Sequence, residues 1–218
     1  LIINSSGAHP LDFVEDFSDD RKSPTQERWQ DRDVFINRTL SIRPPSIGVA
    51  TFDGVDHNGA PYRVNDGIGD YLTSTFIDLS SSTDPHLQFW IQPRGYGFEG
   101  FPMEADSFRV EFKTKDGNWE NVAAYPGIND DPLPEFEAYQ IPIDPKYRSE
   151  KFQFRFSNRT NRPGVLSMWH LDYVFVTPAP LELNNINDLA FSDPPPFILK
   201  PYSSMPYAHF KGNEAKYL

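Results

Sequence analysis

Acidic and amide side chains at two places in this chain have the chemistry to hold a divalent cation. Asp53, Asp56 and Asn58 fall within six residues of a loop rich in Gly, Asn and Asp, while Asp16 and Asp172 lie in the first and last predicted strands. Calcium takes six to eight oxygen ligands, and clustered Asp and Asn supply them. The alternative is that these side chains cap turns by accepting bonds from their own backbone. If a metal binds, we expect structural calcium, with the strand pair favoured over the loop.

Aromatic side chains form a second candidate site. Tyr96, Phe98 and Phe101 lie in one Gly-rich loop, and Trp119 follows a predicted hairpin turn. Together they could form a platform for sugar rings or for a peptide, because loops at one end of a β-sandwich commonly carry the binding residues. The alternative is that the rings fold back over the edge of the core. A proline and a methionine after Phe101 favour a packed loop.

Catalysis is the least favoured class of function. The five histidines have no H-E-x-x-H or comparable spacing, and neither a G-x-S-x-G elbow nor a Gly-rich phosphate loop occurs. With 31 acidic residues, some carboxylate pair will reach glycosidase separation by chance. We therefore expect a non-enzyme, and keep a hydrolase domain only as the last alternative.

The composition excludes several kinds of partner. A formal net charge of −11 disfavours nucleic acid and anionic membrane surfaces, which both need a basic face. The chain has no apolar run near the roughly 20 residues of a membrane span. It also has no cysteine, which removes disulfides and thiolate sites and is more typical of an exported bacterial protein. We expect the sequence to be part of a longer protein.

Alternating apolar residues predict many strands and no long helix. Residues 70–92 read as two strands joined by a polar connection, residues 107–125 as a hairpin with Asp-Gly at its turn, and residues 151–158 and 168–176 as further strands. This pattern predicts an all-β fold, an antiparallel two-sheet jelly-roll sandwich. The side chains expected to share its core are Leu87, Phe89, Ile91, Phe108, Val110, Phe112, Phe152, Phe154 and Phe156.

Several of these strands resemble those of a known family. DYLTSTFIDLSS, LQFWIQ, DSFRVEFKTKDGNW, FQFRFSN and WHLDYVFV, in that order, are similar to the motifs of MAM-like jelly rolls, in particular the cleaved-adhesin (choice-of-anchor) type of secreted Bacteroidetes proteins. The resemblance covers about residues 11–178. GVATFDGVDHNGAPY is also similar to a subset of surface proteins linked to type 9 secretion or gliding. Ser18 stands where the family has a calcium-ligating Glu, and Tyr173 stands where it has a second Asp.

The resemblance implies a non-catalytic module outside the cell. We expect an extracellular or cell-surface interaction or adhesion domain of a larger protein that acts through protein contacts. A carbohydrate-binding module that uses the aromatic platform is the alternative.

Residues 179–218 differ in character from residues 1–178. They are rich in proline, which limits ladder pairing, yet they carry apolar side chains that are poorly suited to free solution. We expect an irregular Pro-rich extension that docks on the sandwich, serves a neighbouring domain or protein partner, and has one short helix after Pro206.

Overall fold

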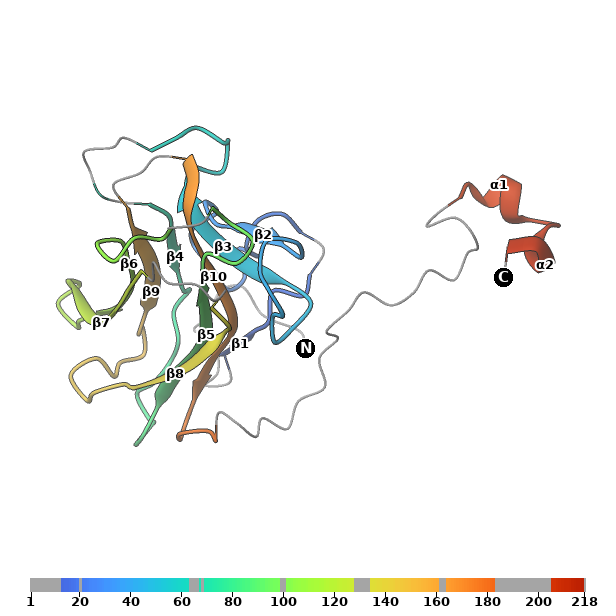
Figure 1. Ribbon diagram of the computed structural model, residues 1–218. Coiled ribbons are helices and arrows are strands. Elements are labelled where there is room, and N and C mark those ends of the chain that lie inside the picture. Colours follow the sequence, from blue (N-terminus) through green and yellow to red (C-terminus); the bar gives the residue numbers. More distant parts are fainter. Residues whose placement is uncertain are drawn as a thin grey trace.

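Two antiparallel sheets packed face to face make up the computed structural model (Figure 1). The structure describes residues 13–19, 21–62, 67, 69–98, 101–127, 134–160, 164–182 and 205–217. The predicted all-β, jelly-roll-like sandwich is confirmed. Within the described part of the chain, no helix is long and apolar enough to cross a membrane.

The strands divide six and four between the sheets. The larger sheet has the order β2 (Phe35–Asn37), β3 (Val49–Gly54), β10 (Gly164–Thr177), β5 (His86–Pro93), β8 (Glu137–Pro142), and β1 (Phe13–Glu15) also pairs with β10. The smaller sheet has the order β4 (Tyr71–Thr73), β9 (Phe154–Arg159), β6 (Ser107–Lys113), β7 (Trp119–Pro126). Two short helices follow near the C-terminal end, α1 (Tyr207–Phe210) and α2 (Glu214–Tyr217).

The long strand β10 organises the larger sheet. β5 pairs along one side of it, and β3 and then β1 pair along the other. Phe13 lies opposite Val176, so the first and last strands are neighbours, as the sequence predicts. This pairing brings the residues after β1 next to the middle of β10.

Residues 70–92 connect the two sheets. β4 belongs to the four-stranded sheet and β5 to the six-stranded sheet, so these strands lie in opposite sheets and are not paired. β4 ends at Thr73, earlier than the alternation predicts, and beyond it Ser74 and Ile77 make only isolated bridges to Trp29 and Phe152.

All nine predicted core side chains are buried in one apolar cluster. On β6 the inward residues alternate with half-buried outward ones, which is the period-two pattern of a strand with one face on a core. Aromatic rings supply much of the contact between the sheets; Phe89, for example, packs edge-on against Phe156 at a centroid distance of 5.0 Å. The predicted face assignment is therefore confirmed.

The polar loop after β1 also contributes to the core. Trp29 is fully buried and donates its indole N–H to the carboxylate of Glu15 over 3.0 Å. A single helical turn positions this ring, because the backbone N–H of Trp29 bonds the carbonyl of Thr25. The loop therefore packs against β1 through Trp29 and against β4 through the hydrogen bond from the N–H of Gln30 to the carbonyl of Thr73.

The predicted docking of residues 179–218 on the sandwich stays a prediction. Two four-residue helices follow Pro206 instead of one, and none of their residues is buried. Before them, the backbone N–H of Leu181 donates to the side chain of Gln140 on β8 over 3.1 Å. Residues 183–204, which carry most of the predicted docking side chains, lie outside the described residues.

Candidate functional site

The loop between β5 and β6 holds two aromatic rings out in solvent. Tyr96 is 68% exposed and Phe98 is 56% exposed. Backbone hydrogen bonds fix the loop beneath them, from the N–H of Tyr96 to the carbonyl of Leu40 and from the N–H of Arg94 to the carbonyl of Met168. These two rings do not cover the core, so the packed-loop alternative fails for them, while Phe101 is half-buried.

Two more apolar side chains are exposed, one on the same loop and one at the start of β10. Asp106 accepts hydrogen bonds from the backbone N–H of Met103 and from the hydroxyl of Ser167, so the loop lies against the start of β10. Met103 is 37% exposed there, and Val165 on β10 is 47% exposed. We call Tyr96, Phe98, Met103 and Val165 the loop-end surface.

Trp119 does not belong to the loop-end surface. It pairs with Lys113 at the far end of β6, whereas the loop joins β6 at Ser107. Seven residues of strand separate those ends, which is about 20 Å at the rise of a β-strand. The four predicted ligand-binding rings therefore do not form one platform.

The surroundings of Trp119 on the outer face of the smaller sheet are aromatic and charged. The guanidinium of Arg155 lies 4.4 Å from the ring centroid of Trp119 and 4.7 Å from that of Tyr71. Glu111 accepts two hydrogen bonds from the same guanidinium, at 2.7 and 3.1 Å. These contacts stabilise the outer face and hold Trp119 in a fixed position.

Oxygen atoms of three segments gather around the hydroxyl of Ser46, between β1 and β10. The acceptors are the carbonyl of Asp16 at 2.6 Å, the carboxylate of Asp172 at 3.0 Å and the carbonyl of Gly48 at 3.2 Å. The carboxylate of Asp172 also accepts hydrogen bonds from the backbone N–H groups of Ser46 and Tyr173, at 2.8 and 2.7 Å. A Cβ at Gly48 would lie 1.9 Å from the carbonyl oxygen of Phe17, so only glycine permits this close approach.

Calcium at this cluster stays a prediction, and it would need more oxygen ligands than the two acids supply. The carboxylate of Asp16 caps Ser18, so Asp16 would contribute its carbonyl. Burial, with the charge of Asp16 adding to it, raises the pKa of Asp172 well above its usual value. Among the described residues, no three His, Asp or Glu side chains form a metal site, so carbonyl and hydroxyl oxygens would have to complete the shell.

Calcium at this cluster predicts a stability loss on chelation. An ion that binds only the folded state, present at about 100 times its Kd, should raise the Tm by about 5 to 10 °C, which EDTA would reverse. Asp172→Asn should abolish the EDTA effect, and Asp56→Asn in the other predicted site should preserve it. An unchanged Tm with EDTA, together with no calcium by elemental analysis, would rule out the ion.

The predicted loop ligands are occupied as turn caps. Asp56 accepts hydrogen bonds from the backbone N–H groups of Asn58 and Ala60, and the bond from Ala60 is the main cause of its lowered pKa. Asp53 accepts one from Val55. Asp53 and Asp56 line one pocket of about 360 Å³ with Asp33 and His57, which are 2.9 Å apart. The geometry shows turn capping, and a cation in this loop stays a prediction.

A buried acidic network below this loop was not predicted from the sequence. Asp70 accepts hydrogen bonds from the backbone N–H of Asp53 and from the hydroxyl of Tyr62, both at 2.8 Å. The side chain of Asn158 bonds the backbone of both acids and ties the loop to β9. Burial raises the pKa of Asp70 to about 8 and that of Asp53 to about 6.

His170 is part of the core and not of an open site. It is fully buried, with Nδ1 2.9 Å from the hydroxyl of Thr51 and Nε2 3.2 Å from the carbonyl of Arg94. Burial lowers its pKa to about 4, so the ring is neutral at pH 7. Its role is structural, because no substrate reaches a fully buried ring.

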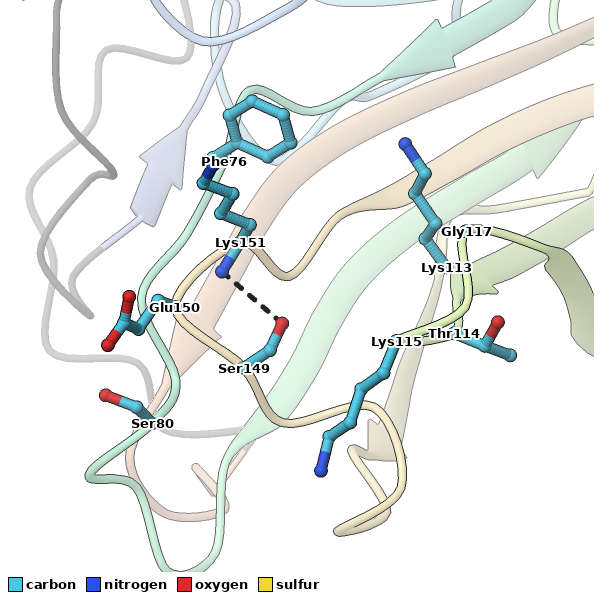
Figure 2. Close-up of a pocket in the computed structure, with 9 residues that line it drawn as sticks. All are labelled: Phe76, Ser80, Lys113, Thr114, Lys115, Gly117, Ser149, Glu150 and Lys151. Carbon is cyan, nitrogen blue, oxygen red and sulfur yellow. Dashed lines mark hydrogen bonds between the residues drawn. The ribbon is translucent and has the colours of Figure 1, made fainter.

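A pocket lined by lysines lies between two loops of the smaller sheet. It measures about 640 Å³ and is lined by Phe76, Ser80, Lys113, Thr114, Lys115, Gly117, Ser149, Glu150 and Lys151. Figure 2 shows residues 149–151 and Phe76 on one side and the β6–β7 hairpin on the other. We call it the lysine pocket.

Comparison with known proteins finds similar solved structures, all at low sequence identity. No protein-family model and no curated protein matches the chain. Among solved structures, the K2 cleaved adhesin domain of Lys-gingipain has a TM-score of 0.48 and 16% identity over 76% of this chain and 97% of its own.

Carbohydrate-binding modules match to a similar degree. The CBM22-1 xylan-binding domain of Paenibacillus barcinonensis Xyn10C has a TM-score of 0.45 and 9% identity, over 76% of this chain and 92% of its own. CBM27-1 of Caldicellulosiruptor saccharolyticus, solved with mannohexaose, has a TM-score of 0.44 and 16% identity, over 78% of this chain and 98% of its own. A Fischerella cyclase and a bacteriophage tailspike domain match as well. Likeness at this level does not separate binding from catalysis.

The residues that sequence reasoning missed are those that depend on strand register. Arg155 and Glu111 are each recognisable as outward residues of an alternating strand, but only the pairing of β6 with β9 places them side by side. Asp70 has a polar sequence neighbourhood and gives no sign of being buried. Its burial follows from the contact with Asn158, which is 88 residues away.

Proposed function

We propose that this chain is a non-catalytic binding module that holds a protein partner through its loop-end surface. The observation that carries this proposal is the exposure of Tyr96 and Phe98, which are fixed by backbone hydrogen bonds at one end of the sandwich. Folding alone does not account for two large rings held in solvent on an ordered loop. Exposed apolar surface of this kind is typical of a protein interface.

The chemistry of the loop-end surface favours protein over glycan. The side chains of Phe98 and Val165 have no hydrogen-bonding group, the thioether of Met103 is only a weak acceptor, and Tyr96 has a single hydroxyl. Aromatic and methionine side chains are enriched at the centre of protein interfaces. A sugar would also require convergent polar groups to orient its hydroxyls. Glycan binding at these rings therefore ranks second.

The setting of the module is part of the same proposal. We place it outside the cell, as a domain of a larger surface or secretion-associated protein of the cleaved-adhesin kind found in Bacteroidetes. The motif order over residues 11–178 and the jelly-roll-like sandwich support this assignment. Residues 179–218 would serve a neighbouring domain or partner, with Leu181 on Gln140 as the start of the contact.

Site-specific photo-crosslinking tests the proposed partner surface. A photoreactive amino acid at position 98 should give discrete crosslinked products with surface proteins of the producing cell. The same group at Asn118, an exposed residue in the β6–β7 hairpin at the far end of β6, is the matched control and should give none. Tyr96→Ser should remove the products while the Tm stays unchanged, since both rings are exposed.

Two results would contradict the proposal. Equal crosslinking from positions 98 and 118 would mean non-specific contact. Loss of the products on adding free oligosaccharide would favour the glycan alternative.

A further inference from the structure

We propose that the lysine pocket is a second binding site, for an acidic polysaccharide whose carboxylates repeat along the chain. It is separate from the loop-end surface and goes beyond the proposed protein contact. The lysine pocket lies at the β6–β7 hairpin, at the Lys113 end of β6, whereas the β5–β6 loop joins β6 at its other end, Ser107.

The first argument is charge. Lys113, Lys115 and Lys151 line the pocket with a single acid, Glu150, in a chain whose acids outnumber its Lys and Arg by 31 to 20. Some other basic side chains do form ion pairs with acids, for example Arg155 with Glu111. Within the described ranges, no carboxylate lies at ion-pair distance from any of the three lysines. The three ammonium groups have no described acid at ion-pair distance. They therefore make the pocket locally positive and attractive to an anion, although the chain as a whole is acidic.

The second argument is the spacing of the amines. In Figure 2, Lys151 extends beside Phe76 on one wall, while Lys113 and Lys115 leave the opposite wall in different directions. The amine of Lys113 is also held by the side-chain oxygen of Gln153 at 2.9 Å. The three charges are therefore spread around the pocket and do not converge on one point. That arrangement suits a polymer with carboxylates at intervals and not a single phosphate.

The third argument is an aromatic ring beside the charges. The amine of Lys151 lies 5.9 Å from the ring centroid of Phe76, which lines the pocket and is 39% exposed. Aromatic faces stack on the apolar C–H face of a pyranose ring. An aromatic ring beside positive charges favours a uronic acid polymer over an acidic peptide. The pocket volume also falls in the usual range for ligand sites.

The test is binding to polygalacturonate, with dextran as the neutral control and poly-L-glutamate as the acidic peptide. We expect the protein to bind polygalacturonate at low salt, to release it as salt rises and to ignore dextran. Lys115→Met with Lys151→Met should weaken binding about tenfold. The matched control, Lys22→Met with Lys211→Met, removes the same charge outside the pocket and should change little. Thermal melts check that each variant is folded.

Phe76→Ser separates sugar recognition from plain charge attraction. It should weaken the binding of polygalacturonate and leave any binding of poly-L-glutamate unchanged. Phe98→Ser, on the loop-end surface, should have no effect on either polymer, so this test fails or succeeds independently of the proposed function. The proposal is overturned if polygalacturonate does not bind, if both double variants weaken it equally, or if poly-L-glutamate binds as tightly and Phe76→Ser changes nothing.

Discussion

Phe154→Ala is expected to lower the free energy of unfolding by about 3 to 5 kcal/mol, the range for a buried phenylalanine. The ring lies fully buried between the sheets, with centroid distances of 5.5 Å to Phe13, 5.8 Å to Trp29 and 5.5 Å to Phe156. Truncation leaves a cavity that these rigid rings cannot fill, because their own neighbours hold them in place. Urea unfolding followed by far-UV circular dichroism measures the loss.

The control is Phe35→Ala on the edge strand β2. Phe35 is exposed, so its removal should cost about 1 kcal/mol or less. A cost under about 1 kcal/mol for Phe154→Ala as well would mean that the sheets are not packed through this ring.

Stability should fall as the pH rises from 6.5 to 8. Burial raises the pKa of Asp70 to about 8, so the folded protein keeps a proton that the unfolded chain, with an ordinary aspartate, has lost. An acid with a raised pKa therefore stabilises the folded state at low pH and ceases to do so as the pH passes that pKa. One proton over this interval is worth about 2 kcal/mol. The raised pKa of Asp172 acts in the same direction.

The window from pH 6.5 to 8 separates this effect from that of His170. The pKa of His170 is lowered to about 4, so the unfolded chain takes up a proton there between about pH 6.5 and pH 4 that the folded protein does not. That group makes the protein less stable as the pH falls, and it opposes Asp70 mainly below pH 6.5, with a contribution of about 0.4 kcal/mol left between pH 6.5 and 8. Measurements above pH 6.5 therefore report chiefly the buried acids.

Asp70→Asn tests the assignment. The amide resembles the protonated acid, so the variant should keep at pH 8 the stability that the natural protein loses, and its pH slope should be flatter. Asp56→Asn is the control in the same loop, because its pKa is lowered and it stays ionised throughout the window. Equal slopes in Asp70→Asn and the natural protein would show that Asp70 is ionised in the folded state.

The sequence by itself determined the fold class and the inward faces of the strands. Alternation along 107–113 and 151–158 is a local property of the chain. Because the apolar face of such a strand is the one that is buried, the alternation indicates which side chains point into the core. The Asp116-Gly117 turn is equally local: Gly117 adopts a φ of 88°, and its N–H closes the turn on Thr114. These features need no knowledge of distant partners.

The tertiary structure decided which chemical groups meet. Tyr96 and Trp119 read alike in sequence as exposed aromatic residues, yet the length of β6 separates them. Asp70 looked like a loop acid and is buried beside Asp53, while lysines from β6, its hairpin and the segment before β9 line one pocket. Each of these contacts depends on strand register and on which sheet a strand joins. Strand register and sheet membership are set by long-range packing. The sequence therefore predicts the fold class and the buried faces of the strands, while the composition of the candidate sites is visible only in the folded structure.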